Sequence, residues 1–141
     1  MANIQEIQSE IIEDFSFLPE WDERYAYLIE LGQNMAALPD EYRTENNIVR
    51  GCQSTVWLQR ECREGKIYLQ ADSDSLIVKG LAALLIKAFS NQPAAEVLRA
   101  ELIFFEKTGL NKHISSQRAN GLMAMIEQIK AFAAECAADP V

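Results

Sequence analysis

The spacing of apolar residues predicts a chain of helices interrupted once by a pair of strands. Apolar side chains recur every three to four positions over residues 4–15, from about 20 to 32 and again in the last third of the chain, which is typical of amphipathic helices. Between these stretches, apolar and polar residues alternate over 55–62 and 67–71, and Gly65 lies in the short turn that separates them. This alternation predicts an antiparallel hairpin.

The stretch over residues 75–89 is apolar on almost every side, so we expect it to form a central helix that other elements cover. A further short helix is expected from Pro93, a short packed element is expected to end at Gly109, and a long C-terminal helix is expected to be capped by Ser115 or Ser116. The strands are grouped in the middle of the chain, without helices alternating between them. This order predicts an α+β fold with helices packed on a small antiparallel sheet.

Length and charge narrow the classes of function. The chain has 141 residues, which fit a single domain over residues 1–141, and a formal net charge of −8 that disfavours nucleic-acid binding. The acidity lies in residues 1–45, where eleven acidic and two basic side chains give −9. This region is expected to be a solvated acidic face, with a docking surface for a basic partner as the alternative. No stretch has the length of a membrane span and no signal peptide is recognised, so a cytoplasmic protein with reduced thiols is expected.

The candidate chemistry is centred on Cys52, within the sequence IVRGCQSTVWL at residues 48–58. Gly51 permits a sharp turn, so the pattern predicts a strand, a turn and a strand with the cysteine at the corner. Polar Gln53 follows the cysteine, and Arg50 is expected to favour the thiolate, which is the nucleophilic form. The alternative is a cysteine that serves as a small packing residue.

The other candidate sites are weaker. Cys62 and Cys136 belong to no Cys-x-x-Cys pair, and an odd number of widely spaced cysteines disfavours a disulfide framework, so both are expected to be packing residues or incidental surface thiols. A zinc site built from the three cysteines and His113 is disfavoured because no ligands are paired in sequence. A cysteine hydrolase would need His113 as its base, but this residue is expected in a loop before the last helix. We find no phosphate-binding loop or cofactor motif.

Four segments resemble those of the SufE family, in the same order and over most of the chain from about residue 21 to 133. They are WDERYAYLIELG at 21–32, NIVRGCQSTVW at 47–57, DSDSLIVKGL at 72–81 and QRANGLMAM at 117–125. One departure concerns the last segment, where the family often has Pro-Ser before the arginine and this chain has Ser116-Gln117.

The resemblance implies a fold similar to the iron–sulfur scaffold protein IscU, with Cys52 as a sulfur acceptor. The expected donor is a cysteine desulfurase of the SufS or CsdA type, which carries pyridoxal phosphate, and the expected recipient is an iron–sulfur scaffold such as a SufBCD-like complex. The chain itself would need no metal or cofactor and would act as a carrier and activator with sulfurtransferase-type chemistry. Arg50, Gly51 and Gln53 would support the cysteine, and Arg118 would help docking or steady the thiolate. Two alternatives remain open: an IscU-like cluster scaffold, and a regulator that binds the desulfurase without using Cys52.

Overall fold

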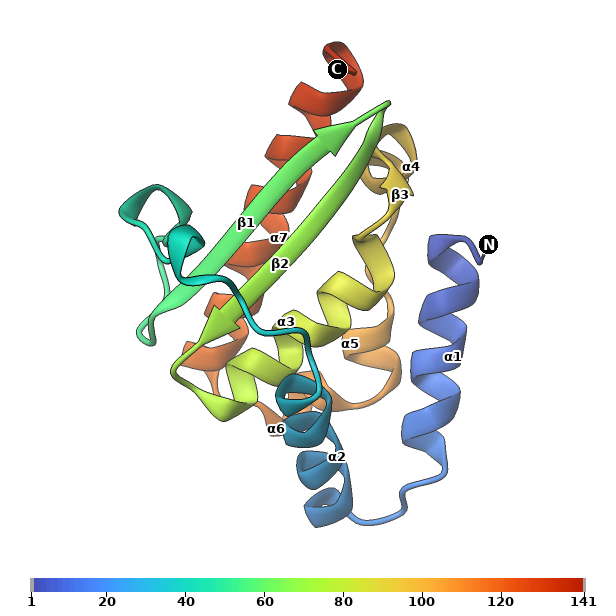
Figure 1. Ribbon diagram of the computed structural model, residues 1–141. Coiled ribbons are helices and arrows are strands. Elements are labelled where there is room, and N and C mark those ends of the chain that lie inside the picture. Colours follow the sequence, from blue (N-terminus) through green and yellow to red (C-terminus); the bar gives the residue numbers. More distant parts are fainter. Residues whose placement is uncertain (1, 141) are drawn as a thin grey trace.

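Helices pack around a small antiparallel sheet in the computed structural model, which describes residues 2–140 (Figure 1). The α+β architecture predicted from the sequence is confirmed. The elements in chain order are α1 (Ile4–Ser16), α2 (Trp21–Gln33), the 3-10 turns η1 (Asp40–Tyr42) and η2 (Glu45–Asn47), β1 (Val56–Arg63), β2 (Lys66–Ser73), α3 (Leu76–Phe89), β3 (Gln92–Pro93), α4 (Ala94–Arg99), α5 (Phe104–Lys107), α6 (Leu110–His113) and α7 (Ser116–Ala138).

Local sequence signals start the main helices. Asn3 forms a capping box with Glu6 at the start of α1, in which each side chain bonds the backbone amide of the other. The Ser75 hydroxyl accepts from the Val78 amide at the start of α3, and Ser115 caps α7 in the same way. These caps satisfy backbone amides that have no partner within the helix.

The sheet is a long hairpin with a short third strand at one edge. β1 and β2 pair antiparallel from Val56↔Ser73 to Arg63↔Lys66. The turn between them contains Gly65 at φ +79°, in the left-handed region that glycine enters without strain. β3 adds only two paired residues beside the start of β2, and the sequence did not predict it.

The central helix α3 is in contact with α1, α2, α7 and β2, as its apolar sequence predicted (Figure 1). Its crossing with α2 is very close, because two glycines face each other there. A Cβ atom added at Gly80 would lie 2.3 Å from the Leu28 carbonyl oxygen, and one added at Gly32 would lie 2.8 Å from the Gly80 nitrogen. Glycine is therefore required at both positions for the two backbones to approach.

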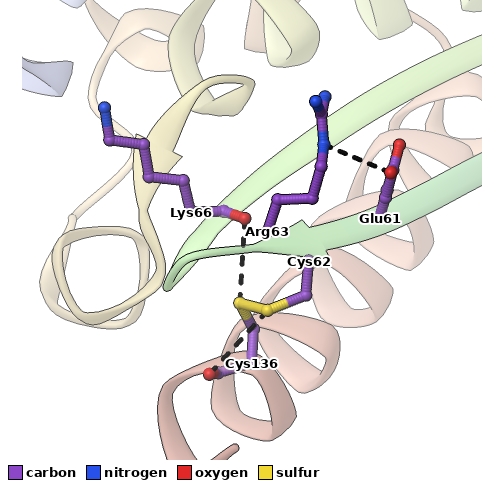
Figure 2. Close-up of a disulfide and its surroundings, with 5 residues drawn as sticks. All are labelled: Glu61, Cys62, Arg63, Lys66 and Cys136. Carbon is purple, nitrogen blue, oxygen red and sulfur yellow. Dashed lines mark hydrogen bonds and ion pairs between the residues drawn. A yellow bond between two sulfur atoms is a disulfide. The ribbon is translucent and has the colours of Figure 1, made fainter. Parts of the chain in front are cut away.

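The prediction that Cys62 and Cys136 are separate thiols was wrong, because they form a disulfide (Figure 2). Cys62 lies near the end of β1, where it faces α7, and Cys136 lies on the buried side of the last turn of α7. Their Cα atoms are 5.7 Å apart although the residues are separated by 74 positions. The fold brings these positions together by packing the helix along the strand, and sequence spacing carries no sign of such a contact.

Candidate functional site

The Cys52 loop begins at a corner held by backbone pairing. Ile48 forms an isolated antiparallel bridge with Trp57, and the Val49 amide donates to the carbonyl of the first residue of β1 at 2.8 Å. The predicted strand before the turn is therefore a single bridge rather than a full strand. Gly51 has φ +92°, which places it in the left-handed region and brings Cys52 to the corner as expected.

The thiol of Cys52 is half-buried against α7. Its Sγ lies 3.9 Å from the Gly121 carbonyl oxygen, to which the S–H donates. A Cβ atom added at Gly121 would lie 3.5 Å from this Sγ and 4.0 Å from a methyl group of Val78 in α3. A Cβ on Gly51 would lie 3.8 Å from the Ala124 methyl group. The loop thus packs on α7 where that helix carries small residues.

Burial of the thiol raises the pKa of Cys52 above its ordinary value, because the thiolate loses hydration. The sequence predicted the opposite influence, from Arg50. In the structure Arg50 is exposed, and within residues 2–140 its side chain has no hydrogen-bond or ion-pair partner. The expectation that this arginine favours the thiolate was therefore wrong for this conformation, and desolvation sets the direction of the shift.

The end of the loop is fastened to the junction between β2 and α3. The Thr55 amide donates to Asp74 Oδ1 at 3.0 Å, and the Asp74 amide donates back to the Thr55 carbonyl at 3.3 Å. The Ser73 hydroxyl donates to the same carbonyl at 2.9 Å. Ser75 caps α3, and Asp74 holds the Cys52 loop.

A charged cluster holds the segment before the loop against the hairpin. Arg43 pairs with Asp72 at 2.5 Å, and its guanidinium lies 5.1 Å from the centre of the Trp57 ring. Lys79 pairs with the other oxygen of Asp72 at 3.2 Å. Burial of Asp72 acts to raise its pKa, but hydrogen bonds from Arg43, the Ser73 amide and Lys79 outweigh that effect and lower it. Arg43 was not predicted as a site residue, since its partners lie in distant elements.

The remaining predicted site residues do not meet at the thiol. Gln53 is exposed, and Arg118 is exposed in the first turn of α7, where its backbone amide bonds Ser115. His113 ends α6 just before α7 and stacks on the Trp21 ring with centroids 3.5 Å apart. Within the described residues no group of three or more histidine, cysteine and acidic side chains is arranged to hold a metal ion. Gly121 was not predicted as a site residue; its signal in the sequence is a glycine inside an expected helix.

Comparison with known proteins identifies the family. A model of the SufE family, described as an Fe-S metabolism associated domain, matches residues 9–133. The chain belongs to the SufE family. This membership assigns the protein to iron–sulfur metabolism. Within residues 2–140, no helix has both the length and the apolar character to cross a membrane.

Individual relatives agree with this assignment over nearly their full lengths. An uncharacterized SufE-like protein of Rhizobium meliloti is 44% identical over 129 residues, which are 88% of this chain and 92% of the relative. A second such protein, from Rhizobium etli, is 42% identical over 126 residues, or 86% and 85% of the two chains. The solution structure of a hypothetical protein from Thermus thermophilus superposes with a TM-score of 0.78 at 22% identity, covering 94% of this chain and 97% of that one. This superposition shows that the two proteins have the same fold.

Proposed function

We propose that this protein carries sulfur from a cysteine desulfurase to iron–sulfur cluster assembly, and that Cys52 is the accepting residue. The observation that carries the proposal is the setting of Cys52. It is the free cysteine of the described residues, it lies at a glycine corner, and its sulfur is half-buried against α7. Membership of a family associated with iron–sulfur metabolism supplies the context.

The transfer step is an exchange between divalent sulfur atoms. The Cys52 thiol first loses its proton, and the thiolate attacks the outer sulfur of a persulfide on the desulfurase. A sulfur–sulfur bond forms on Cys52 while the one on the partner breaks, and the partner's cysteine leaves as a thiolate that takes up a proton. One bond replaces another, so no oxidant or reductant is consumed. Pyridoxal phosphate is required only by the partner, where it releases sulfur from cysteine.

The surroundings of Cys52 suit a sulfur atom that must be kept between two partners. Gly121 leaves the space beside Sγ without a side chain. The same half-burial that raises the pKa of the thiol limits the access of small thiols to a persulfide. The sulfur would then pass to a cluster-assembly scaffold by a second exchange of the same kind.

The decisive experiment is intact-mass analysis after the full chain is mixed with a cysteine desulfurase and cysteine, followed by peptide mapping. The expected result is the gain of one sulfur atom on Cys52, removed by a thiol reductant and absent from the Cys52→Ser variant. The Cys62→Ser/Cys136→Ser variant is the matched control and should still gain sulfur on Cys52.

Two results would contradict the carrier function. One is an unmodified Cys52 while the partner's persulfide turns over. The other is a Cys52→Ser variant that stimulates the desulfurase as well as the native chain does, which would favour a regulator that carries no sulfur. Iron or zinc retained by the purified chain would instead favour a cluster scaffold.

A further inference from the structure

A second sulfur site lies at the far end of β1 from the Cys52 loop. Figure 2 shows this pair, Cys62 and Cys136, with its neighbours. β1 begins at Val56, just after the loop, and Cys62 is six positions further along the strand. A strand rises by about 3.3 Å per residue, which separates these two positions by about 20 Å. The pair formed by Cys62 and Cys136 therefore cannot exchange sulfur with Cys52 of the same chain in this conformation, and it is a separate site.

The surroundings of the pair suit both of its oxidation states. Cys62 Sγ lies 3.9 Å from the Cys136 carbonyl oxygen, and Cys136 Sγ lies 3.8 Å from the Lys66 carbonyl oxygen (Figure 2). The sulfur atoms of a disulfide have no proton to donate. After reduction the two sulfur atoms must move apart, and these carbonyl oxygens lie beside them as acceptors for the new S–H groups.

The bond links the last turn of α7 to β1. Earlier in the helix, Lys130 Nζ donates to the Val97 carbonyl at 2.7 Å, and Arg60 donates to Gln128 at 3.0 Å. In the last turn of α7, Cys136 is the buried residue among those described. Opening the disulfide should consequently loosen the last turn and leave the rest of the helix in place.

We propose that Cys62 and Cys136 form a reversible redox clasp, which a dithiol reductant opens and a disulfide oxidant closes. The reductant's thiolate attacks Cys62, the more exposed sulfur, and Cys136 leaves as a thiolate that takes up a proton. The second thiol of the reductant then displaces Cys62, so two electrons pass to the protein and the reductant becomes a disulfide. Closure is the reverse reaction. The proposal does not rest on the proposed role of Cys52.

The test follows the pair in the full chain. The protein is equilibrated from its oxidised and its reduced state in mixtures of reduced and oxidised dithiothreitol, labelled with N-ethylmaleimide and mapped by mass spectrometry. We expect Cys62 and Cys136 to gain label together in one transition that is the same from both directions, while Cys52 is labelled in both states. A Cys52→Ser variant should show the same transition.

Hydrogen exchange then reports what the clasp does. In the reduced protein, amides of residues 134–138 should exchange at least tenfold faster, while those of 120–130 stay unchanged. The Cys62→Ser/Cys136→Ser variant should show the same pattern of exchange without reductant. If that variant does not fold, the comparison of the oxidised and reduced native chain alone decides whether the bond slows exchange at the end of α7. The proposal is overturned if no bond forms under oxidising conditions, if the bond resists reductant until the chain unfolds, or if reduction leaves exchange at the end of α7 unchanged.

Discussion

Breaking the bond between Cys62 and Cys136 should lower the free energy of unfolding by about 2–4 kcal/mol. The bond closes a loop of 74 residues. The chain-entropy account assigns roughly 4.5 kcal/mol at 25 °C to a loop of this length, since the crosslinked unfolded chain has fewer conformations. Residual structure in the unfolded chain makes the actual stabilisation smaller than this calculated value, which is why the expected range extends down to about 2 kcal/mol.

The assay is urea unfolding of the oxidised and the reduced native chain at the same pH, followed by far-UV circular dichroism. For a urea dependence of about 2 kcal/mol per molar, the midpoint of the reduced protein should be about 1–2 M lower. A separate comparison of Cys136→Ala with the native chain is made in reductant, where neither protein contains the bond. The difference in their free energies of unfolding measures the effect of removing the buried sulfur alone.

Two results would contradict the effect assigned to the crosslink. Coincident midpoints for the oxidised and reduced protein would show that the bond does not constrain the unfolded chain. Under oxidising conditions, Cys62→Ala and the double Cys62→Ala/Cys136→Ala variant should be destabilised to a similar extent, apart from the small cost of the second cavity, because each lacks the same bond. Fully additive losses from the two single substitutions would refute the assignment of the effect to the crosslink.

Three further predictions concern the core and the thiol. Gly80→Ala should lower the free energy of unfolding, measured in urea, by about 1–3 kcal/mol, since the added Cβ would lie 2.3 Å from a carbonyl oxygen of α2. The control is Gly121→Ala, whose Cβ would lie 3.5 Å from the Cys52 sulfur and which should therefore be much less destabilising. Equal losses of stability in the two variants would contradict the close crossing of α2 and α3. Gln8→Leu should lower the free energy of unfolding by about 2–4 kcal/mol, because the side-chain oxygen of Gln8 accepts hydrogen bonds from two backbone amides. Gln5→Leu, at an exposed position, is the control, and equal urea midpoints for the two variants would contradict this role of Gln8. The rate of Cys52 alkylation should rise with pH through a midpoint above that of a short peptide of the same sequence, and a midpoint at or below the peptide's would contradict the effect of burial.

The helices and the hairpin could be predicted because their signals are local. Asn3 and Ser75 cap the helices that begin directly after them, and the alternation on both sides of Gly65 gives the hairpin. Each of these signals lies within a few residues of the element that it specifies. Hydrophobic periodicity then supplies the buried face, so local sequence is sufficient for most of the architecture.

Features that depend on distant partners could not be predicted. Gln8 is polar, yet it is buried in α1 because its amide donates to the Glu101 carbonyl and its oxygen accepts from the Ile103 and Phe104 amides. β3 exists only because Gln92 and Pro93, which follow α3, pair with the first two residues of β2. The disulfide has the same origin, since it depends on how far along the sheet α7 extends.

The candidate site also has one feature that local sequence predicts and one that depends on distant contacts. The corner at Cys52 follows from Gly51, which is its neighbour in sequence, whereas the pKa of the thiol follows from α7, which reaches it through Gly121 at 69 positions' distance. Arg50 is close in sequence but exposed, so proximity along the chain predicted the wrong direction. A raised pKa lowers the fraction of the thiol that is present as the nucleophilic thiolate. Under the proposed function, a partner that rehydrates the thiol or supplies a base would therefore speed sulfur acceptance.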